Sequence, residues 1–170
     1  MLEKDLTILE ILTIGHPVLA QKAEKIEDIN QVILDLAENM VFTMYSAPGI
    51  GLAAPQINHS LRLITADLSI GEKSDGLLVL INPELIEKEG KEVLEEGCLS
   101  VPGINEKIAR PFRVSVRGTD LNGKEKIVEA EGLLARVLCH EIDHINGKLF
   151  IEHLSPLKRN LIKKKMNKTV

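Results

Sequence analysis

The feature of this sequence that most constrains its fold is the pair of histidines His140 and His144, with Glu141 between them. Residues four apart lie on the same face of a helix, so both imidazoles can bind one metal ion if this segment is helical. Glu141 is then turned by about 100° from His140 and can reach a water molecule at the ion without binding the ion. We therefore predict a helix over residues 131–145, which ends at the Asn-Gly pair that follows.

A catalytic zinc-type site usually takes three protein ligands and keeps one position open, so a third ligand is needed. The metzincin pattern is met at Gly147, but it requires histidine at position 150, where this sequence has Phe150. Thermolysin-like enzymes use a downstream glutamate as third ligand, and Glu152 lies too close in sequence to the two histidines for that arrangement. His153 is an alternative that has no motif behind it. Cys98 is the best soft donor upstream, and the glycine before it lets the backbone approach closely. The residues alone also leave open a closed structural metal site or a polar helix face with unrelated histidines.

Cys139, next to His140, is the rival donor. Its side chain points about 100° away around the helix, so we interpret it as a buried core thiol. A disulfide between Cys98 and Cys139 is a minor alternative, because two cysteines make a poor disulfide framework. The first ten residues contain acidic side chains and no long apolar stretch, so no signal peptide is expected. We therefore predict a cytoplasmic chain with reduced thiols.

Hydrophobic spacing and turn signals predict two further helices and several strands. Apolar residues three and four apart indicate an amphipathic helix over 29–44, and another helix begins after Pro156. Strands are predicted at Leu61–Asp67, Leu77–Ile81, Lys91–Leu94, Phe112–Gly118 and Lys126–Ala130, with turns at Gly71, Asn82-Pro83, Gly90 and Asn122-Gly123. Strands clustered between helices without regular alternation indicate the α+β class, in one domain over residues 1–170.

Charge and composition exclude several functional classes. The net charge of −4 lacks the basic footprint of a general DNA-binding protein, so no DNA partner is expected. With three Phe, one Tyr and no Trp, the chain has too few aromatic side chains to stack the bases of single-stranded nucleic acid. No apolar run approaches the roughly 20 residues of a membrane span, so no membrane partner is expected either.

Residues 49–56 read Gly-Ile-Gly-Leu-Ala-Ala-Pro-Gln, and their small side chains let the backbone approach a ligand closely. No Gly-Lys-Ser/Thr follows, so a phosphate-binding loop is excluded, and a structural turn is the default interpretation of this segment alone. Together with Glu-Gly-Cys-Leu-Ser at 96–100 and His-Glu-x-x-His at 140–144, however, the segment resembles the peptide deformylase family. All three motifs are complete and in family order, and the similarity runs from Ile11 to Pro156.

This resemblance implies a fold of antiparallel β-sheets packed around a central metal-binding helix, with an N-terminal and a C-terminal helix. It implies that Cys98, His140 and His144 bind one divalent ion, with Fe²⁺ most expected and Zn²⁺, Ni²⁺ or Co²⁺ able to replace it. Glu141 matches the general acid and base of the family. The implied reaction removes the N-formyl group from the formylmethionine of nascent polypeptides by hydrolysis and releases formate.

The same resemblance implies which residues contact the substrate. Gln56 and the backbone N–H of Leu99 match the groups that hold the formyl oxygen. Ile50 and Gly51 match backbone that pairs with the substrate peptide in β-fashion. Arg110 matches an arginine that many members of the family carry near the substrate entrance.

For some residues the resemblance leaves an ordinary structural role as an equally good explanation, or meets a difference from the family. The methionine side chain needs an apolar slot, and ordinary core packing explains the candidates equally well: Ile50, Leu133, Val137 and Ile142. The basic helix over 158–168 matches a family helix that can dock near the ribosomal exit tunnel, although a solvated helix end also explains its charge. Residue 139 is Cys where relatives often carry Gln. The alternative enzyme is a zinc peptidase, which shares the His-Glu-x-x-His motif.

Overall fold

The computed structural model describes residues 5–168. Residues 1–4 and 169–170 of the predicted domain lie outside the described residues. The first of these ranges is the start of the segment in which no signal peptide is expected. Within the described residues the α-helices are α1 (Gln31–Ser46), α2 (Gly132–Ile145) and α3 (Pro156–Asn167). The strands are β1 (Gly51–Ala53), β2 (Leu63–Ala66), β3 (Leu78–Glu89), β4 (Glu92–Cys98), β5 (Val101–Arg110), β6 (Arg113–Thr119) and β7 (Glu125–Glu131). Short 3₁₀ turns lie at Pro17–Ala20, Ala54–Ile57 and Phe150–His153.

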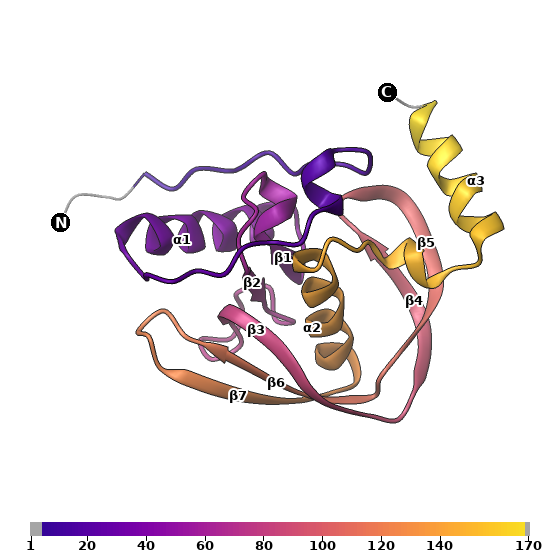
Figure 1. Cartoon of the computed structure of the whole chain (residues 1–170). Helices are drawn as coiled ribbons and strands as arrows, with labels where there is room; N and C mark the ends of the chain where they lie inside the picture. Colours follow the sequence, from indigo (N-terminus) through magenta and orange to yellow (C-terminus); the bar gives the residue numbers. More distant parts are fainter. Residues whose placement is uncertain (1–4, 169–170) are drawn as a thin grey trace.

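Five strands form one antiparallel sheet in the order β1-β2-β3-β6-β7, and β4 and β5 form a separate two-stranded ribbon. Helix α2 lies centrally, in contact with both the five-stranded sheet and strand β5 of the ribbon (Figure 1). The predicted α+β class, with antiparallel sheets around a central helix, is therefore confirmed. No helix in the described part of the chain is long and apolar enough to span a membrane.

Helix α2 is held by one apolar face and by a glycine at its end. Its buried apolar residues pack against the five-stranded sheet in one cluster: Ala135, Leu138, Cys139, Ile142 and Ile145. Full burial of one Leu or Ile side chain stabilises a fold by roughly 1.5–3 kcal/mol. After the helix, Gly147 has a φ of +76°, and a Cβ there would lie 2.8 Å from the carbonyl oxygen of Ala20. Glycine at this position therefore ends the helix and lets the N-terminal segment pack closely on it.

Helix α1 begins and ends two residues later than predicted, because Asn30 is its cap. The Asn30 side chain accepts a hydrogen bond of 3.2 Å from the backbone N–H of Ile33. The predicted apolar stripe packs in a second core cluster with strands β1 and β2, and its most buried members are Leu36, Met40 and Met44.

The strand predictions failed at Asn82-Pro83, where β3 continues rather than turns. Asn82 has a φ of 51°, and the register with β6 shifts between Ile81 and Glu84. The Asn82 side chain accepts from the backbone N–H of Ile26 and donates to its carbonyl oxygen, both at 2.9 Å. The predicted turn is thus a bulge that the N-terminal segment fixes from the side. Strands β1 and β5 were not predicted at all.

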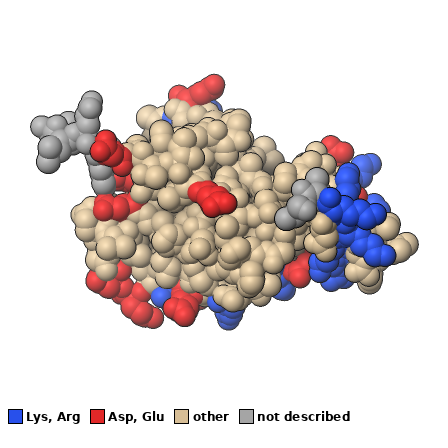
Figure 2. Space-filling view, turned by 90° about the horizontal axis from the view of Figure 1, so that it is seen from above, with Lys and Arg blue, Asp and Glu red and all other residues tan. Residues whose placement is uncertain are grey.

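Helix α3 extends away from the body of the molecule (Figure 1). Ile162 is buried against the ribbon and the turn at Phe150–His153, whereas Leu157 and Leu161 are 71% and 58% exposed. Lys158 forms an ion pair of 3.0 Å with Glu106 of β5. Lys and Arg side chains gather at this end of the molecule, while the rest of the same face is mostly uncharged (Figure 2).

A buried carboxylate fixes the loop between β2 and β3 and links it to α1. Asp67 accepts hydrogen bonds from the Tyr45 hydroxyl at 2.6 Å, from the Ser69 backbone and hydroxyl at 2.8 and 2.7 Å, and from Gly71 N–H at 3.0 Å. Burial opposes ionisation of Asp67, but these hydrogen bonds outweigh it and lower its pKa to about 2. The backbone N–H of Asp67 also donates to Ile50 O, so the loop supports the start of β1.

We expect Tyr45→Phe to destabilise the fold by about 1.5–3 kcal/mol at neutral pH, the usual contribution of a hydrogen bond to a charged group. The folded-state pKa of Asp67 lies below its unfolded value of about 3.9. The stability that the hydrogen bond contributes is therefore complete above about pH 3.9 and is lost as the pH falls toward 2. Urea unfolding of both proteins between pH 7 and pH 2 measures the difference. A difference that stays constant across this range would contradict the assignment.

Candidate metal centre

Three potential metal ligands converge at the centre of the molecule. Cys98 Sγ lies 3.3 Å from His144 Nε2, and His144 Nε2 lies 3.2 Å from His140 Nε2. All three donor atoms lie within 4.8 Å of one another. The imidazoles come from successive turns of α2, and the sulfur comes from the last residue of β4, where the register with β5 shifts. The structure thus brings together the three residues that the sequence predicts as ligands.

The donor set fits a divalent transition-metal ion. Tetrahedral coordination with bonds of about 2.0–2.3 Å places neighbouring donor atoms roughly 3.3–3.6 Å apart, close to the observed spacing. One sulfur and two imidazole nitrogens suit Zn²⁺, Fe²⁺, Ni²⁺ or Co²⁺ better than Ca²⁺ or Mg²⁺. No other His, Cys, Asp or Glu of the described chain joins this group, so three ligands leave room for solvent or substrate.

The two histidines have opposite electrostatic environments. Burial lowers the pKa of His144 well below its usual value, so this imidazole is neutral and ready to bind a cation. Burial also acts to lower the pKa of His140, but hydrogen bonds with Cys98 and Glu96 outweigh it and raise this pKa well above the usual value. The carboxylate of Glu96 on Nδ1 leaves His140 Nε2 as the nitrogen that faces the other donor atoms.

The other donors considered from the sequence lie outside the cluster. Cys139 is 7% exposed in the core between α2 and the sheet, and burial raises the pKa of its thiol to about 11. Both cysteines are free thiols, so no disulfide joins them. His153 contacts Asp143 at 2.8 Å instead of the ligands, and Glu152 lines a different cavity.

Glu141 is a buried carboxylate beside the donor cluster. Its side chain packs against Gly51, where any Cβ would overlap with Glu141 Oε1. Glycine at position 51 is therefore what lets β1 pass so close to this carboxylate. Burial raises the pKa of Glu141 to about 7, and its Oε2 atom has no hydrogen-bond partner among the described residues. Such a group can exchange a proton with a reactant near neutral pH.

Gln56 lies next to Cys98 and is 2% exposed. Its Oε1 atom accepts from the backbone N–H of Ala53 at 2.9 Å, which fixes the orientation of the amide. The Nε2 atom donates to Ser100 Oγ at 3.1 Å and to Cys98 Sγ at 3.7 Å. The N–H groups of Gln56 therefore point toward the donor cluster, where they can reach a developing oxyanion.

Glu96 is a residue beside the ligands that the sequence motifs do not predict. Its side chain is buried and contacts three basic groups: Arg110 Nη2 at 2.7 Å, Arg136 Nη1 at 3.1 Å and His140 Nδ1 at 2.7 Å. A carboxylate on the second ring nitrogen fixes the orientation of a metal-binding histidine and raises its basicity. A signal was present, because Glu96 opens the Glu-Gly-Cys-Leu-Ser motif that contains Cys98.

Arg110 has a different place from the one expected near the substrate entrance. Its guanidinium is 4% exposed and forms ion pairs with Glu96 at 2.7 Å and Asp143 at 2.6 Å. It also lies 3.1 Å from His153 and does not line the cavity beside the metal ligands. Arg110 therefore belongs to the buried charge network around Glu96, and its contact with substrate stays a prediction.

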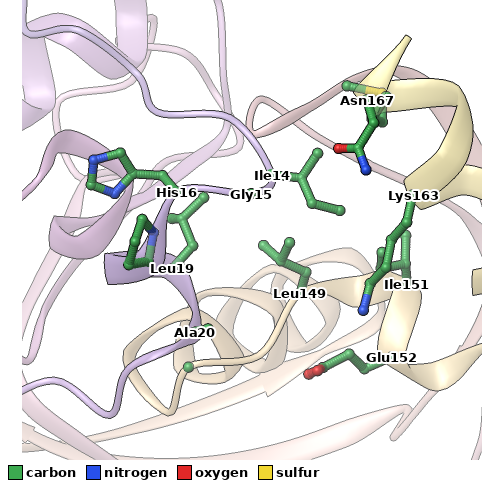
Figure 3. Close-up of a pocket in the computed structure, with 13 residues that line it drawn as sticks. Ile14, Gly15, His16, Leu19, Ala20, Leu149, Ile151, Glu152, Lys163 and Asn167 are labelled. Atoms are coloured by element: carbon green, nitrogen blue, oxygen red, sulfur yellow. The ribbon is translucent and has the colours of Figure 1, made fainter. Parts of the chain in front are cut away.

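A cavity of about 280 Å³ opens beside the donor cluster. Ile50, Leu133 and Val137, three of the four apolar candidates for the methionine slot, line it, and Ile142 packs in the core instead. A second cavity, of about 320 Å³, lies between the turn at Pro17–Ala20, Leu149 and α3 (Figure 3). It shares no lining residue with the first cavity, and Cys98, His140 and His144 do not line it.

Comparison with known proteins agrees with this geometry. The family model for polypeptide deformylase matches residues 8–160. The chain belongs to the peptide deformylase family. It is 52% identical to the peptide deformylase of Thermodesulfovibrio yellowstonii over 160 residues, which cover 94% of this chain and 97% of the relative. The peptide deformylase of Halothermothrix orenii is 50% identical over 155 residues, which cover 91% of this chain and 99% of the relative.

Solved peptide deformylases also share the fold. The structure from Legionella pneumophila matches with a TM-score of 0.90 and 43% identity, covering 96% of this chain and 95% of that one. The structure from Ehrlichia chaffeensis in complex with actinonin matches with a TM-score of 0.88 and 38% identity, covering 96% of this chain and 98% of that one. The family, the fold class and the metal-dependent deformylase activity predicted from the three motifs are therefore confirmed.

Proposed function

We propose that Cys98, His140 and His144 hold one Fe²⁺ ion, and that this chain uses it in the cytoplasm to hydrolyse the formamide of N-formylmethionyl peptides. The observation that carries this proposal is the convergence of three donor atoms within 4.8 Å, beside a buried carboxylate. A divalent ion held there lowers the pKa of water and polarises a carbonyl oxygen. The free thiols support a reducing compartment, and nascent chains are the substrate of the family.

Glu141 supplies the proton transfers. Amide hydrolysis is slow because water is a weak nucleophile at neutral pH and an amine is a poor leaving group. The Glu141 carboxylate can take a proton from the attacking water and then give it to the departing nitrogen. Its pKa of about 7 allows both directions of transfer near neutral pH. Formate and a free α-amine are the products.

The N–H groups of Gln56 and the backbone N–H of Leu99 stabilise the negative charge that develops on the formyl oxygen. Leu99 directly follows Cys98 and lines the same cavity as the donor cluster. The amide of Gln56 is oriented in advance by Ala53 N–H, so it loses no freedom when the charge develops.

We expect Gln56→Ala to raise the activation barrier by about 2.7–4 kcal/mol, the usual effect of removing one oxyanion donor. The measurement is kcat/KM for a formyl-methionyl peptide, with the metal content of both proteins matched. Ser100→Ala is the control, because it removes the neighbouring partner of Gln56 and leaves the amide in place. A wild-type kcat/KM in metal-loaded Gln56→Ala would end the oxyanion assignment.

The edge strand β1 can bind the peptide part of the substrate by adding a strand to the sheet. Strand β1 pairs only with β2, so its other edge is free among the described strands. The carbonyl of Ile50 already accepts a bond from Asp67, so Gly51 is the better candidate for backbone pairing. The Ile50 side chain instead lines the cavity with Leu133 and Val137, which suits the methionine side chain.

Anaerobic purification with metal analysis, followed by a formate-release assay, tests the proposal. We expect about one metal ion per chain, mostly iron, and turnover of formyl-methionyl peptides. Unformylated methionyl peptides and internal peptide bonds serve as the control for a zinc peptidase. Cleavage of those substrates without formate release would overturn the proposal, and a different resident ion would overturn the iron assignment alone.

We further propose that α3 docks on the ribosome through its basic and apolar outer face. Leu157 and Leu161 are exposed and lie four apart on the helix, next to six basic residues over 158–168. We expect deletion of residues 157–170 to abolish co-sedimentation with ribosomes at low salt. The double change Leu157→Glu and Leu161→Glu leaves the buried Ile162 in place and should weaken binding as well. Unchanged association of both variants would remove the proposal.

A further inference from the structure

Arg136 links the two elements that carry the metal ligands. It lies on α2 one turn before His140, and its side chain is 3% exposed. Its Nη1 atom donates to Ile108 O on β5 at 2.8 Å and to Glu96 at 3.1 Å, and its Nη2 atom donates to Glu92 O on β4 at 2.8 Å. One guanidinium from the helix thus binds both strands of the β4–β5 ribbon.

This link matters because the ribbon forms no sheet hydrogen bonds with the five-stranded sheet. An isolated two-stranded ribbon is only marginally stable, so its position depends on side-chain contacts. Apolar packing of Val101 and Ile108 against the turn at Phe150–His153 holds one side of the ribbon. Cys98 is on the ribbon and both imidazoles are on α2, so the shape of the ligand set depends on how the ribbon is fixed to the helix.

We propose that Arg136 is a positioning residue that holds the Cys98 strand at the distance and angle the histidine pair requires. This inference depends on one part of the proposed function, namely that Cys98, His140 and His144 are the metal ligands. Arg136 acts through Glu96, which it shares with His140, and through the backbone of the ribbon. Arg136 and Arg110 both pair with the buried carboxylate of Glu96, so this charge is compensated from two sides.

The chemistry of this contact requires arginine. The planar guanidinium presents several donors in a fixed fork, so it can reach carbonyls on two strands and a carboxylate at once. Lysine places one nitrogen at the end of a flexible chain and can hold only part of this set. Methionine keeps most of the apolar stem that lines the cavity but offers no donor.

The test compares Arg136→Met and Arg136→Lys with Arg117→Met, which removes an exposed ion pair of 3.0 Å with Glu84 on the five-stranded sheet. Zinc affinity is measured by competition with a chromogenic chelator, without substrate. We expect Arg136→Met to bind zinc about 10–100-fold more weakly, which is the usual effect of removing a residue that supports a metal ligand. Arg136→Lys should bind zinc about tenfold more weakly. Arg117→Met should bind zinc like the wild type.

A second readout separates positioning from general stability. The visible absorption of the Co²⁺-loaded protein reports the geometry of its ligands, so we expect it to change in both Arg136 variants. A lower Tm with unchanged zinc affinity and an unchanged Co²⁺ spectrum would overturn the proposal. If Arg136→Met does not fold, Arg136→Lys decides by the same two measurements. If Cys98→Ala still bound zinc like the wild type, that result would contradict the proposed ligand set. If the metal-loaded wild type released no formate, that result would contradict the proposed reaction.

Discussion

Glu141→Ala is expected to keep its metal ion and to lose about 10²–10⁴ in kcat, the usual contribution of a general acid or base. The carboxylate lines the cavity beside the donor cluster, and its Oε2 atom has no hydrogen-bond partner among the described residues, so it is free to exchange a proton. Its removal leaves the three donors intact, and binding of the ion should therefore persist. Formate release under single-turnover conditions, with metal content measured on the same sample, checks both parts.

Glu141→Gln is the matched variant, because it keeps the shape that packs against Gly51 but cannot accept the proton. We expect it to be as slow as Glu141→Ala and more stable, since it leaves no cavity. Full activity in either metal-loaded variant would refute the role of Glu141. Loss of metal in both would show that the carboxylate supports the ion rather than the reaction.

Cys98→Ala is expected to lose most of its bound metal on dialysis, and activity should fall with metal content. Two imidazoles on one helix remain, but among the described residues of the ribbon Cys98 alone belongs to the donor cluster, so its loss leaves two of the three donors. Elemental analysis after dialysis against a weak chelator gives the stoichiometry directly.

Cys139→Ala is the control for this experiment, because that thiol is buried in the apolar core and lies outside the donor cluster. We expect it to keep full metal content and to lose only about 1–2 kcal/mol of stability from the small cavity. The reverse result, with metal retained by Cys98→Ala and lost by Cys139→Ala, would exchange the roles of the two cysteines.

The sequence predicted the helices better than the strands for physical reasons. Periodic apolar residues identify α1, and the His-Glu-x-x-His spacing with the Asn-Gly pair after it identifies α2. Strand β5 contains Pro102 and Gly103, and its apolar residues Ile104 and Ile108 are four apart, a spacing typical of helices. Only pairing with β4 makes this segment a strand. Strand β1 is three residues long, too short for any alternation to show.

The candidate site was predicted as residue types but not as contacts. The motifs gave the donors Cys98, His140 and His144, which the structure brings together. They did not predict that Glu96 contacts His140, or that Arg110 is buried in an ion pair with Glu96. Which way a charged side chain points depends on the distant elements that pack around it, and sequence spacing does not contain that information.

Division of the donors between a helix and a separate ribbon has a thermodynamic consequence. A cation that binds both elements adds a cross-link between two units that share no sheet hydrogen bonds, so its binding free energy also protects the ribbon from local unfolding. Hydrogen exchange of the ribbon amides should accordingly report the free metal concentration, even in a protein whose main sheet remains closed.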